Sequence, residues 1–215
     1  EDDFQPDTEI AEANNMINEE YGEEQSRITI VTLAEDNVLS RGSLLTQLNM
    51  ENETLKSEKV TSVIKSTNQN RNGISSPAKL ISQAKFINRS LSLMEEAPIE
   101  DPSKEMDNPI QKELMNKAFS LNISEMKTIL NGGELSIQLS PAPHPIILDF
   151  NEYEPNQIKD FYQNPILSET FPLKDVLTFL LSKDYDETTQ TAEKSLMTLS
   201  INTNISEDES LEVEK

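Results

Sequence analysis

The sequence predicts an α+β fold in which a small sheet is interrupted by a long, mainly helical insertion. Three observations lead to this prediction: a strand–helix–strand pattern near the start, a middle section with helical periodicity, and an alternating strand near the end. The predicted units are residues 1–68, the first half of the α/β unit; residues 69–182, the insertion with one short strand; and residues 183–215, the return strand and the start of a truncated helix.

The first unit is predicted to contain a helix followed by a βαβ motif. Asp7 can cap a helix whose apolar residues recur at helical spacing. Arg27–Leu33 is rich in β-branched residues and predicts a strand. A second helix should start at Ser40 or Ser43 and have three leucines on one side, namely Leu44, Leu48 and Leu55. Residues 60–64 predict a second strand, and the short spacing would place it parallel to the first.

The middle of the chain is predicted to be mainly helical. Ser76-Pro77 and Asn108-Pro109 both place a capping residue before a proline, which is typical of helix starts. Each predicted helix has one apolar face: Leu80, Ala84, Ile87 and Leu91 in the first, and Ile110, Leu114, Ala118 and Leu121 in the second. A shorter helix over residues 124–130 should end at Gly132-Gly133. Residues 68–76 predict a polar linker, and residues 97–109, with three prolines, predict a loop.

The last part of the chain is predicted to alternate strands and helices. Residues 134–139 and 196–201 alternate apolar and polar side chains, so each predicts a strand with one buried face. The apolar run at 146–150 does not distinguish a strand from a helix. Residues 171–181 predict a helix with four side chains inward, Leu173, Val176, Leu177 and Leu180. Ser206 and Glu209 form a capping-box pattern. We therefore expect a helix there that continues past the last residue, with an acidic frayed tail as the alternative. The acidic opening of the chain likewise indicates a cut end.

The composition excludes several classes of function. Asp and Glu number 39 against 18 Lys and Arg, a net charge of −21. This balance disfavours nucleic-acid binding and attachment to anionic lipid through a basic patch. The chain has no cysteine, which excludes disulfides, thiolate metal sites and cysteine nucleophiles. No apolar run approaches the roughly 18 residues needed to cross a bilayer.

No pattern of residues predicts a catalytic or metal site. His144, the only histidine, lies between two prolines and is interpreted as a loop residue. The acidic group at 184–187 lacks the alternate spacing and central glycine of a calcium loop, so it indicates a solvated surface. Met115 and Met126 are interpreted as core residues and not as an adaptable binding surface. We therefore name no catalytic, cofactor-binding or metal-binding residue, and we predict that the chain is not an enzyme.

Three short stretches carry a resemblance to a known family: residues 1–7 (EDDFQPD), residues 38–40 (VLS) with 60–63 (VTSV), and residues 181–186 (LSKDYD). In their order they are similar to the first extracytoplasmic loop of RND-superfamily exporters, in the MmpL- and Patched-like branch common in archaea. Residues 1–7 (EDDFQPD) resemble the acidic F-x-P segment after that family's first transmembrane helix. Residues 38–40 (VLS), leading to 60–63 (VTSV), resemble its helix and V-x-S-V strand. Residues 181–186 (LSKDYD) resemble its LS-x-D element before the next strand. The resemblance covers the two ends of the chain and not the helical middle.

The resemblance implies a ferredoxin-like, porter-type subdomain on the extracytoplasmic side of the cell membrane. Such a domain would contribute to substrate passage or gating for hydrophobic or amphiphilic, lipid-like molecules. The family's ion-coupling carboxylates lie in transmembrane helices. The implied partners are the transmembrane helices and second extracytoplasmic loop of the same polypeptide and a lipid-like substrate, with no nucleic acid and no cofactor. The full-length protein would be able to form a homo-oligomer. The sequence leaves open a second hypothesis, a secreted or surface-anchored binding protein with no transport role.

Overall fold

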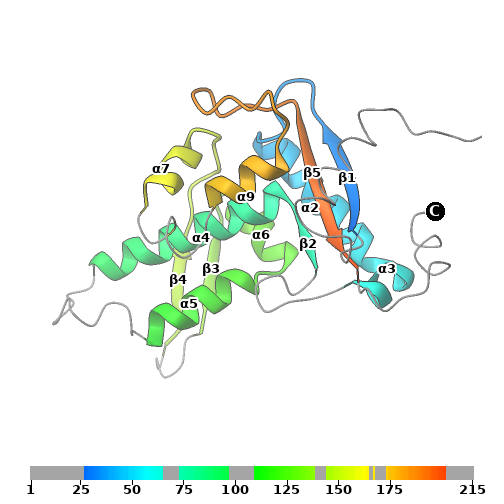
Figure 1. Ribbon diagram of the computed structural model, residues 1–215. Helices are drawn as coiled ribbons and strands as arrows, with labels where there is room; N and C mark the ends of the chain where they lie inside the picture. The colour runs from blue at the N-terminus through cyan, green and yellow to red at the C-terminus, as the bar shows by residue number, and fades with distance from the viewer. Residues whose placement is uncertain are drawn as a thin grey trace, which may run out of the picture.

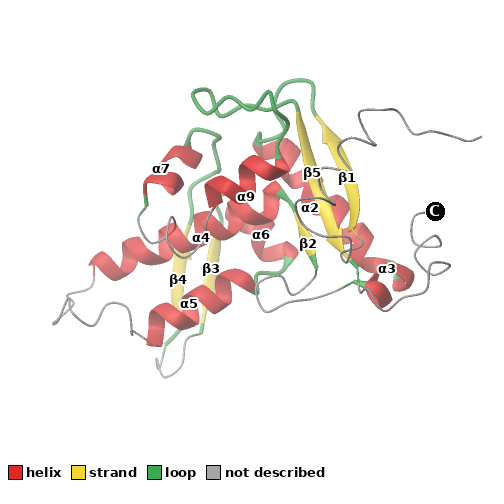
Figure 2. Cartoon of the chain, in the orientation of Figure 1, coloured by secondary structure: helices red, strands yellow, loops and turns green. Residues whose placement is uncertain are grey.

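The computed structural model confirms the α+β class. It describes residues 27–64, 73–96, 109–138, 144–164, 167 and 173–201. Helices and strands are mixed along these residues, as Figure 2 shows. The helices are α2 (Arg41–Lys56), α3 (Glu58–Val63), α4 (Pro77–Glu96), α5 (Pro109–Phe119), α6 (Ile123–Leu130), α7 (Gln157–Gln163) and α9 (Leu173–Leu180). The strands are β1 (Arg27–Leu33), β2 (Ile74–Ser75), β3 (Glu134–Ile137), β4 (Ile146–Asp149) and β5 (Lys194–Ser200).

The strands form two small antiparallel sheets. β5 is the central strand of the first sheet, which has the order β1-β5-β2. It pairs with β1 over seven residues, from Arg27 opposite Ser200 to Leu33 opposite Lys194. The second sheet consists of β3 and β4. In Figure 1 the two sheets lie on opposite sides of the molecule, with α4, α6 and α9 between them. The strands predicted near residues 27, 134 and 196 are confirmed over the bounds given above.

The predicted second strand at 60–64 is wrong, because this segment is mostly helix α3. Only Ile64 reaches the sheet, through a single antiparallel bridge to Ile201. Val63 is buried. Val60 packs against a small hydrophobic cluster beside the sheet, whose buried members are Ile74, Met197 and Leu199. Valines three positions apart face the same side of a helix but opposite sides of a strand. Helical geometry therefore lets Val60 pack against this cluster while Val63 is buried on the same side of the helix, which outweighs the β-propensity of the segment.

The parallel βαβ unit predicted near the start is consequently not formed by the described residues. Every strand pair among them is antiparallel. The predicted polar linker also differs, because Ile74 in it is fully buried and forms β2 with Ser75. A ferredoxin-like arrangement stays a prediction, since the described strands do not test it in detail.

Helix α4 lies at the centre of the main core. It contacts α2, α5, α6, α7 and α9. Its predicted inward residues are all buried: Leu80, Ala84, Ile87 and Leu91. The same hydrophobic cluster includes Leu44 and Leu48 of α2 and Ala192 just before β5. The helical insertion therefore shares one core with residues of both flanking units, while the proposed boundaries near 68 and 182 stay predictions.

The remaining helices follow the predicted faces with one exception. In α5, Leu114 and Ala118 are buried and Ile110 packs against the core. In α9, the side chains of Leu173, Leu177 and Leu180 are buried, but Val176 is 36% exposed. At about 100° per residue, Val176 lies at the margin of the buried stripe. The apolar run at 146–150 forms β4, and α7 had not been predicted.

Other predicted elements lie outside the described residues. These are the helix after Asp7, the loop over 97–108 and the last helix from Ser206. Their predictions are therefore untested by the structure.

Two buried amides join segments that are distant in sequence. The amide nitrogen of Gln47 donates to the backbone oxygen of Val38 at 3.1 Å and to Ser195 Oγ at 3.3 Å. The amide oxygen of Gln47 accepts from the backbone N–H of Ala78 at 3.2 Å. Asn37 joins the loop after β1 to the residues before β5, because its Nδ2 donates to the Gln190 carbonyl at 3.1 Å. These bonds fasten α2, α4 and β5 to one another.

The end of α6 is fastened to the chain that follows β4. Gly132 has a φ of 75°, which favours glycine, and closes the helix as predicted. A Cβ at this position would lie 2.5 Å from the backbone nitrogen of Glu152. The backbone N–H of Tyr153 donates to the Leu130 carbonyl at 3.0 Å across the same junction. The other end of α6 has a capping box formed by Asn122 and Glu125, so the helix starts slightly earlier than predicted.

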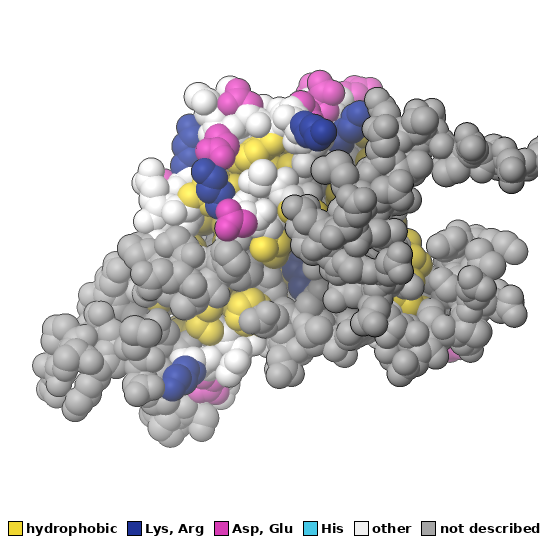
Figure 3. Space-filling view, viewed as in Figure 1, with side chains coloured by type: hydrophobic (Ala, Val, Ile, Leu, Met, Phe, Trp, Pro, Cys, Tyr) yellow, Lys and Arg dark blue, Asp and Glu magenta, His cyan; other side chains and the backbone are white. Residues whose placement is uncertain are grey.

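The surface of the described part carries charges of both signs. On the face in Figure 3, Lys and Arg side chains lie near Asp and Glu, with hydrophobic side chains in separate areas between them. Residues 1–26 contain ten Asp and Glu and no Lys or Arg, so much of the excess negative charge lies outside the described part. None of the helices that the structure describes combines the length and apolarity needed to span a membrane.

We predict that Gln47→Leu destabilises the chain by about 2–3 kcal/mol. The variant keeps a similar volume but leaves the Val38 carbonyl and the Ala78 N–H without their partner, and buried polar groups without partners are costly. Urea unfolding followed by circular dichroism measures the change. Asn49→Leu, at an exposed position on the same helix, is the matched control and should change stability by less than about 0.5 kcal/mol. Equal effects of the two substitutions would contradict the role of Gln47.

Two glycine substitutions should act in opposite directions. Gly132→Ala should destabilise the chain by more than about 1 kcal/mol, because the position needs a positive φ and its Cβ would meet backbone atoms. Gly42→Ala lies in α2 with no atom within 4 Å of the added Cβ, so it should stabilise the chain by up to about 1 kcal/mol. Thermal unfolding of both variants tests the pair, and a stabilising effect of Gly132→Ala would overturn this account of the junction.

Candidate functional site

A small pocket lies between α4, α7 and the end of β4. Its volume is about 200 Å³, which is smaller than the roughly 300 Å³ at which sites for drug-sized ligands begin. Its lining is mostly polar and contains three charged residues and two aromatic rings: Lys85, Asn88, Arg89, Ser92, Phe150, Asn151, Gln157, Asp160 and Phe161. Polar groups that converge in a concave site are the usual feature of ligand binding.

Helical spacing explains why these side chains meet. Lys85, Asn88, Arg89 and Ser92 follow at intervals of three, one and three residues, so they share one face of α4. Gln157, Asp160 and Phe161 share one face of α7 in the same way. Phe150 and Asn151 follow directly after β4 and contribute the third side of the pocket. The phenyl rings of Phe86 and Phe150 stack at 6.5 Å and fix that side against α4.

Lys85 is a buried cation that is bonded to neutral groups. It is 4% exposed, and its Nζ donates to Asn151 Oδ1 at 3.0 Å and to Gln157 Oε1 at 2.9 Å. The same nitrogen lies 6.0 Å from the centre of the Tyr153 ring. Burial lowers the pKa of Lys85 to about 8, and the nearby Glu154 carboxylate partly opposes this shift. Lys85 therefore remains mainly protonated at neutral pH, without an ion pair among the described residues.

Arg89 and Asp160 line the same pocket on opposite helices without pairing. Arg89 donates from Nε to the Asp149 carbonyl at 2.9 Å, and its other guanidinium nitrogens bond to no described residue. The carboxylate of Asp160 makes no hydrogen bond or ion pair with any residue in the described part of the chain. Both groups are thus available to a molecule in the pocket.

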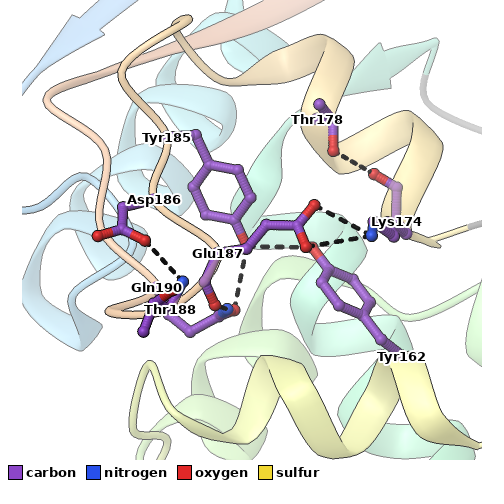
Figure 4. A network of polar contacts seen from close by, with 8 residues as sticks. All are labelled: Tyr162, Lys174, Thr178, Tyr185, Asp186, Glu187, Thr188 and Gln190. Atoms are coloured by element: carbon purple, nitrogen blue, oxygen red, sulfur yellow. Dashed lines mark hydrogen bonds and ion pairs between the residues drawn. The ribbon is translucent and has the colours of Figure 1, made fainter.

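A polar network holds α7 against the loop before β5 (Figure 4). Tyr185 donates from its hydroxyl to Gln190 Oε1 at 3.0 Å, so Tyr162 is the donor in the 3.3 Å bond between the two phenols. Burial and the bond to Tyr185 raise the pKa of Tyr162. Lys174 of α9 pairs with Glu187 at 3.0 Å and lies over the Tyr162 ring at 5.9 Å. Since the raised pKa keeps the Tyr162 hydroxyl protonated, we interpret the network as one that positions α7.

A larger pocket elsewhere has a different character. It has a volume of about 490 Å³ and is lined by the end of α2, the α5–α6 junction and Lys79. Lys79 is 5% exposed and donates from Nζ to the Ile74 carbonyl at 3.0 Å. Burial lowers the pKa of Lys79 to about 8, while the buried Glu51 opposes the shift. The one charged side chain that lines this pocket already fastens β2 to α4, so we regard the smaller pocket as the candidate site.

The sequence-based interpretations of single residues fit the positions found. His144 is exposed at a bend before β4. Met126 is fully buried and Met115 packs against the core, which confirms their structural role. The acidic residues at 184–187 lie in the loop of Figure 4, and in the described part of the chain no three His, Asp or Glu residues gather as metal ligands would.

Sequence reasoning did not find the pocket. The polar residues of α4 recur at helical spacing, which was a usable signal for one wall. The opposite wall was missed because α7 had not been recognised as a helix. Nothing in the sequence relates residues 85–92 to residues 157–161, which only the packing brings together.

Comparisons with known proteins identify no relative. No protein-family model matches the sequence, and neither a curated protein nor a solved structure matches the chain.

The stability of the chain should depend on pH through Lys85. Its pKa falls from 10.5 to about 8 on folding, so between these values the unfolded chain binds more protons and stability rises with pH. Lys85→Met removes this contribution. The unfolding free energy of the wild type should therefore increase relative to that of the variant as the pH rises from about 8 to about 10. Denaturant titrations over this range measure the difference.

Lys56→Met provides the control for this pH dependence. Lys56 lies on the surface of α2, where it pairs with Glu53 at 2.7 Å. Its variant should unfold with a curve parallel to that of the wild type over the same range. A constant difference between wild type and Lys85→Met would show that Lys85 is not a buried cation.

Proposed function

We propose that this chain is a non-enzymatic domain of an RND-superfamily exporter, on the extracytoplasmic side of the cell membrane. One observation carries the proposal: β1 and β5 pair antiparallel, with Arg27 opposite Ser200. The polypeptide therefore enters and leaves this sheet side by side. Adjacent entry and exit points, which are common among domains, suit a domain inserted between two neighbouring spans of a longer membrane protein.

The stretch at 181–186 gives further support. Leu181 forms a bridge to Ser195, and the backbone N–H of Ser182 donates to the Lys194 carbonyl at 3.1 Å. Asp184 accepts from the Glu193 N–H at 2.9 Å. Residues 181–186 thus lie directly beside the start of β5, which agrees with the order that the resemblance implies. The resemblance is weaker at 60–63, where the implied strand is a helix, and residues 1–7 lie outside the described part.

Within an exporter, the domain would act in substrate passage or gating for lipid-like molecules by moving as one body. A single hydrophobic cluster joins α2, the helical insertion and the residues before β5. Closely packed interiors transmit displacement instead of absorbing it. A movement of the neighbouring membrane spans would therefore displace the whole core.

The pocket between α4 and α7 favours a second candidate function. A secreted or surface-anchored binding protein with no transport role would also present a preformed polar site on a rigid core. This alternative needs no membrane span on both sides of the chain.

The complete reading frame around this sequence separates the two proposals. The exporter proposal predicts apolar segments of about 20 residues on both sides of residues 1–215, with several more downstream. A labelling experiment tests on which side of the membrane the chain lies. Single cysteines are introduced at the exposed positions Thr46 and Asp175 of the full-length protein and labelled in intact cells. Labelling by a membrane-impermeant maleimide is expected. A frame with one hydrophobic segment, or labelling only after lysis, would overturn the proposal.

A further inference from the structure

The pocket between α4 and α7 has more positive charge than its own residues neutralise. Lys85 and Arg89 lie one helical turn apart on α4, an arrangement in which like charges repel. Lys85 is bonded to two amide oxygens and not to a carboxylate. Buried charges in proteins are normally paired. An anionic group in the pocket would give Lys85 and Arg89 a charged partner within hydrogen-bond distance, where the described residues provide only neutral oxygens.

The opposite wall limits what the anion can be. Asp160 lines the pocket from α7, and its carboxylate is unpaired in the described part of the chain. It would repel a multiply charged oxyanion such as phosphate, but it would accept hydrogen bonds from an ammonium group. Phe150 and Phe161 add apolar surface to the lining. The pocket of about 200 Å³ therefore presents two cations, one free acid and two rings.

From this combination we infer that the pocket binds a small α-amino acid as a zwitterion. The carboxylate lies against the guanidinium of Arg89 and the ammonium of Lys85, which are strong donors to carboxylates. The ligand's ammonium group lies toward Asp160, and its side chain lies against Phe150 and Phe161. This assignment does not depend on whether the chain belongs to an exporter.

Calorimetric titration of the complete chain with matched probes tests the assignment. The probes are L-alanine, L-valine and L-leucine, with propionate lacking the ammonium group, ethylamine lacking the carboxylate, and inorganic phosphate. At least one amino acid should bind saturably, and each partial probe should bind at least about tenfold more weakly, since each loses charge-assisted hydrogen bonds. The inference fails if no amino acid binds, or if propionate or phosphate binds as tightly as the amino acids.

Charge-removing variants test the location. Arg89→Gln and Asp160→Asn should each weaken amino-acid binding at least about tenfold. Arg41→Gln and Asp175→Asn, at positions outside the pocket lining, are the matched controls and should bind as the wild type does. Circular dichroism checks that each variant folds. If Arg89→Gln does not fold, Asp160→Asn still tests the location, because the Asp160 side chain bonds to no other described residue. Unchanged binding by Asp160→Asn, or equal loss in the controls, would overturn the assignment.

Discussion

The structure depends on a helix whose first half is buried on all sides although it carries two lysines. Residues 76–87 at the start of α4 are all buried, including Lys79 and Lys85. Each buried donor there needs a partner, and the surrounding elements provide it. The amide of Gln47 accepts from the first turn of α4, and the β2 backbone accepts from Lys79. The residues after β4 and the start of α7 accept from Lys85. The positions of α2, β2 and α7 around α4 are thus set by polar bonds as well as by apolar packing.

The candidate site is a consequence of the same arrangement. Beyond residue 87, α4 becomes partly exposed at Asn88 and Arg89, and α7 covers it only in part. The pocket forms at this transition, where polar side chains of both helices still face each other. The network of Tyr162, Tyr185 and Gln190 keeps α7 at this distance from α4 by fastening it to the loop before β5. A site on such fastened helices is better ordered than one on loops.

The paired strands β1 and β5 connect the first and last described parts of the chain. Their pairing extends over seven residues, and Asn37 and Gln47 fasten the loop after β1 to the residues around the start of β5. Because of this long-range pairing, the polypeptide enters and leaves the sheet at neighbouring positions. Leu196 of β5 and Ala192 just before it pack in the same core as the helices, so a displacement of β5 would be transmitted to the helices around the pocket.

Local patterns in the sequence determined the α+β class, the strands near residues 27, 134 and 196, and the helices that begin at Pro77 and Pro109, because caps, prolines and apolar periodicity act within a few residues. Tertiary structure alone decided three features. Residues 58–63 became a helix because helical spacing lets Val63 be buried while Val60 packs against the cluster beside the sheet. Ile74 and Ser75 became a strand because β5 offered them backbone partners. The pocket arose because packing brought α4 and α7 together across more than sixty residues of sequence, a distance over which no local pattern carries information.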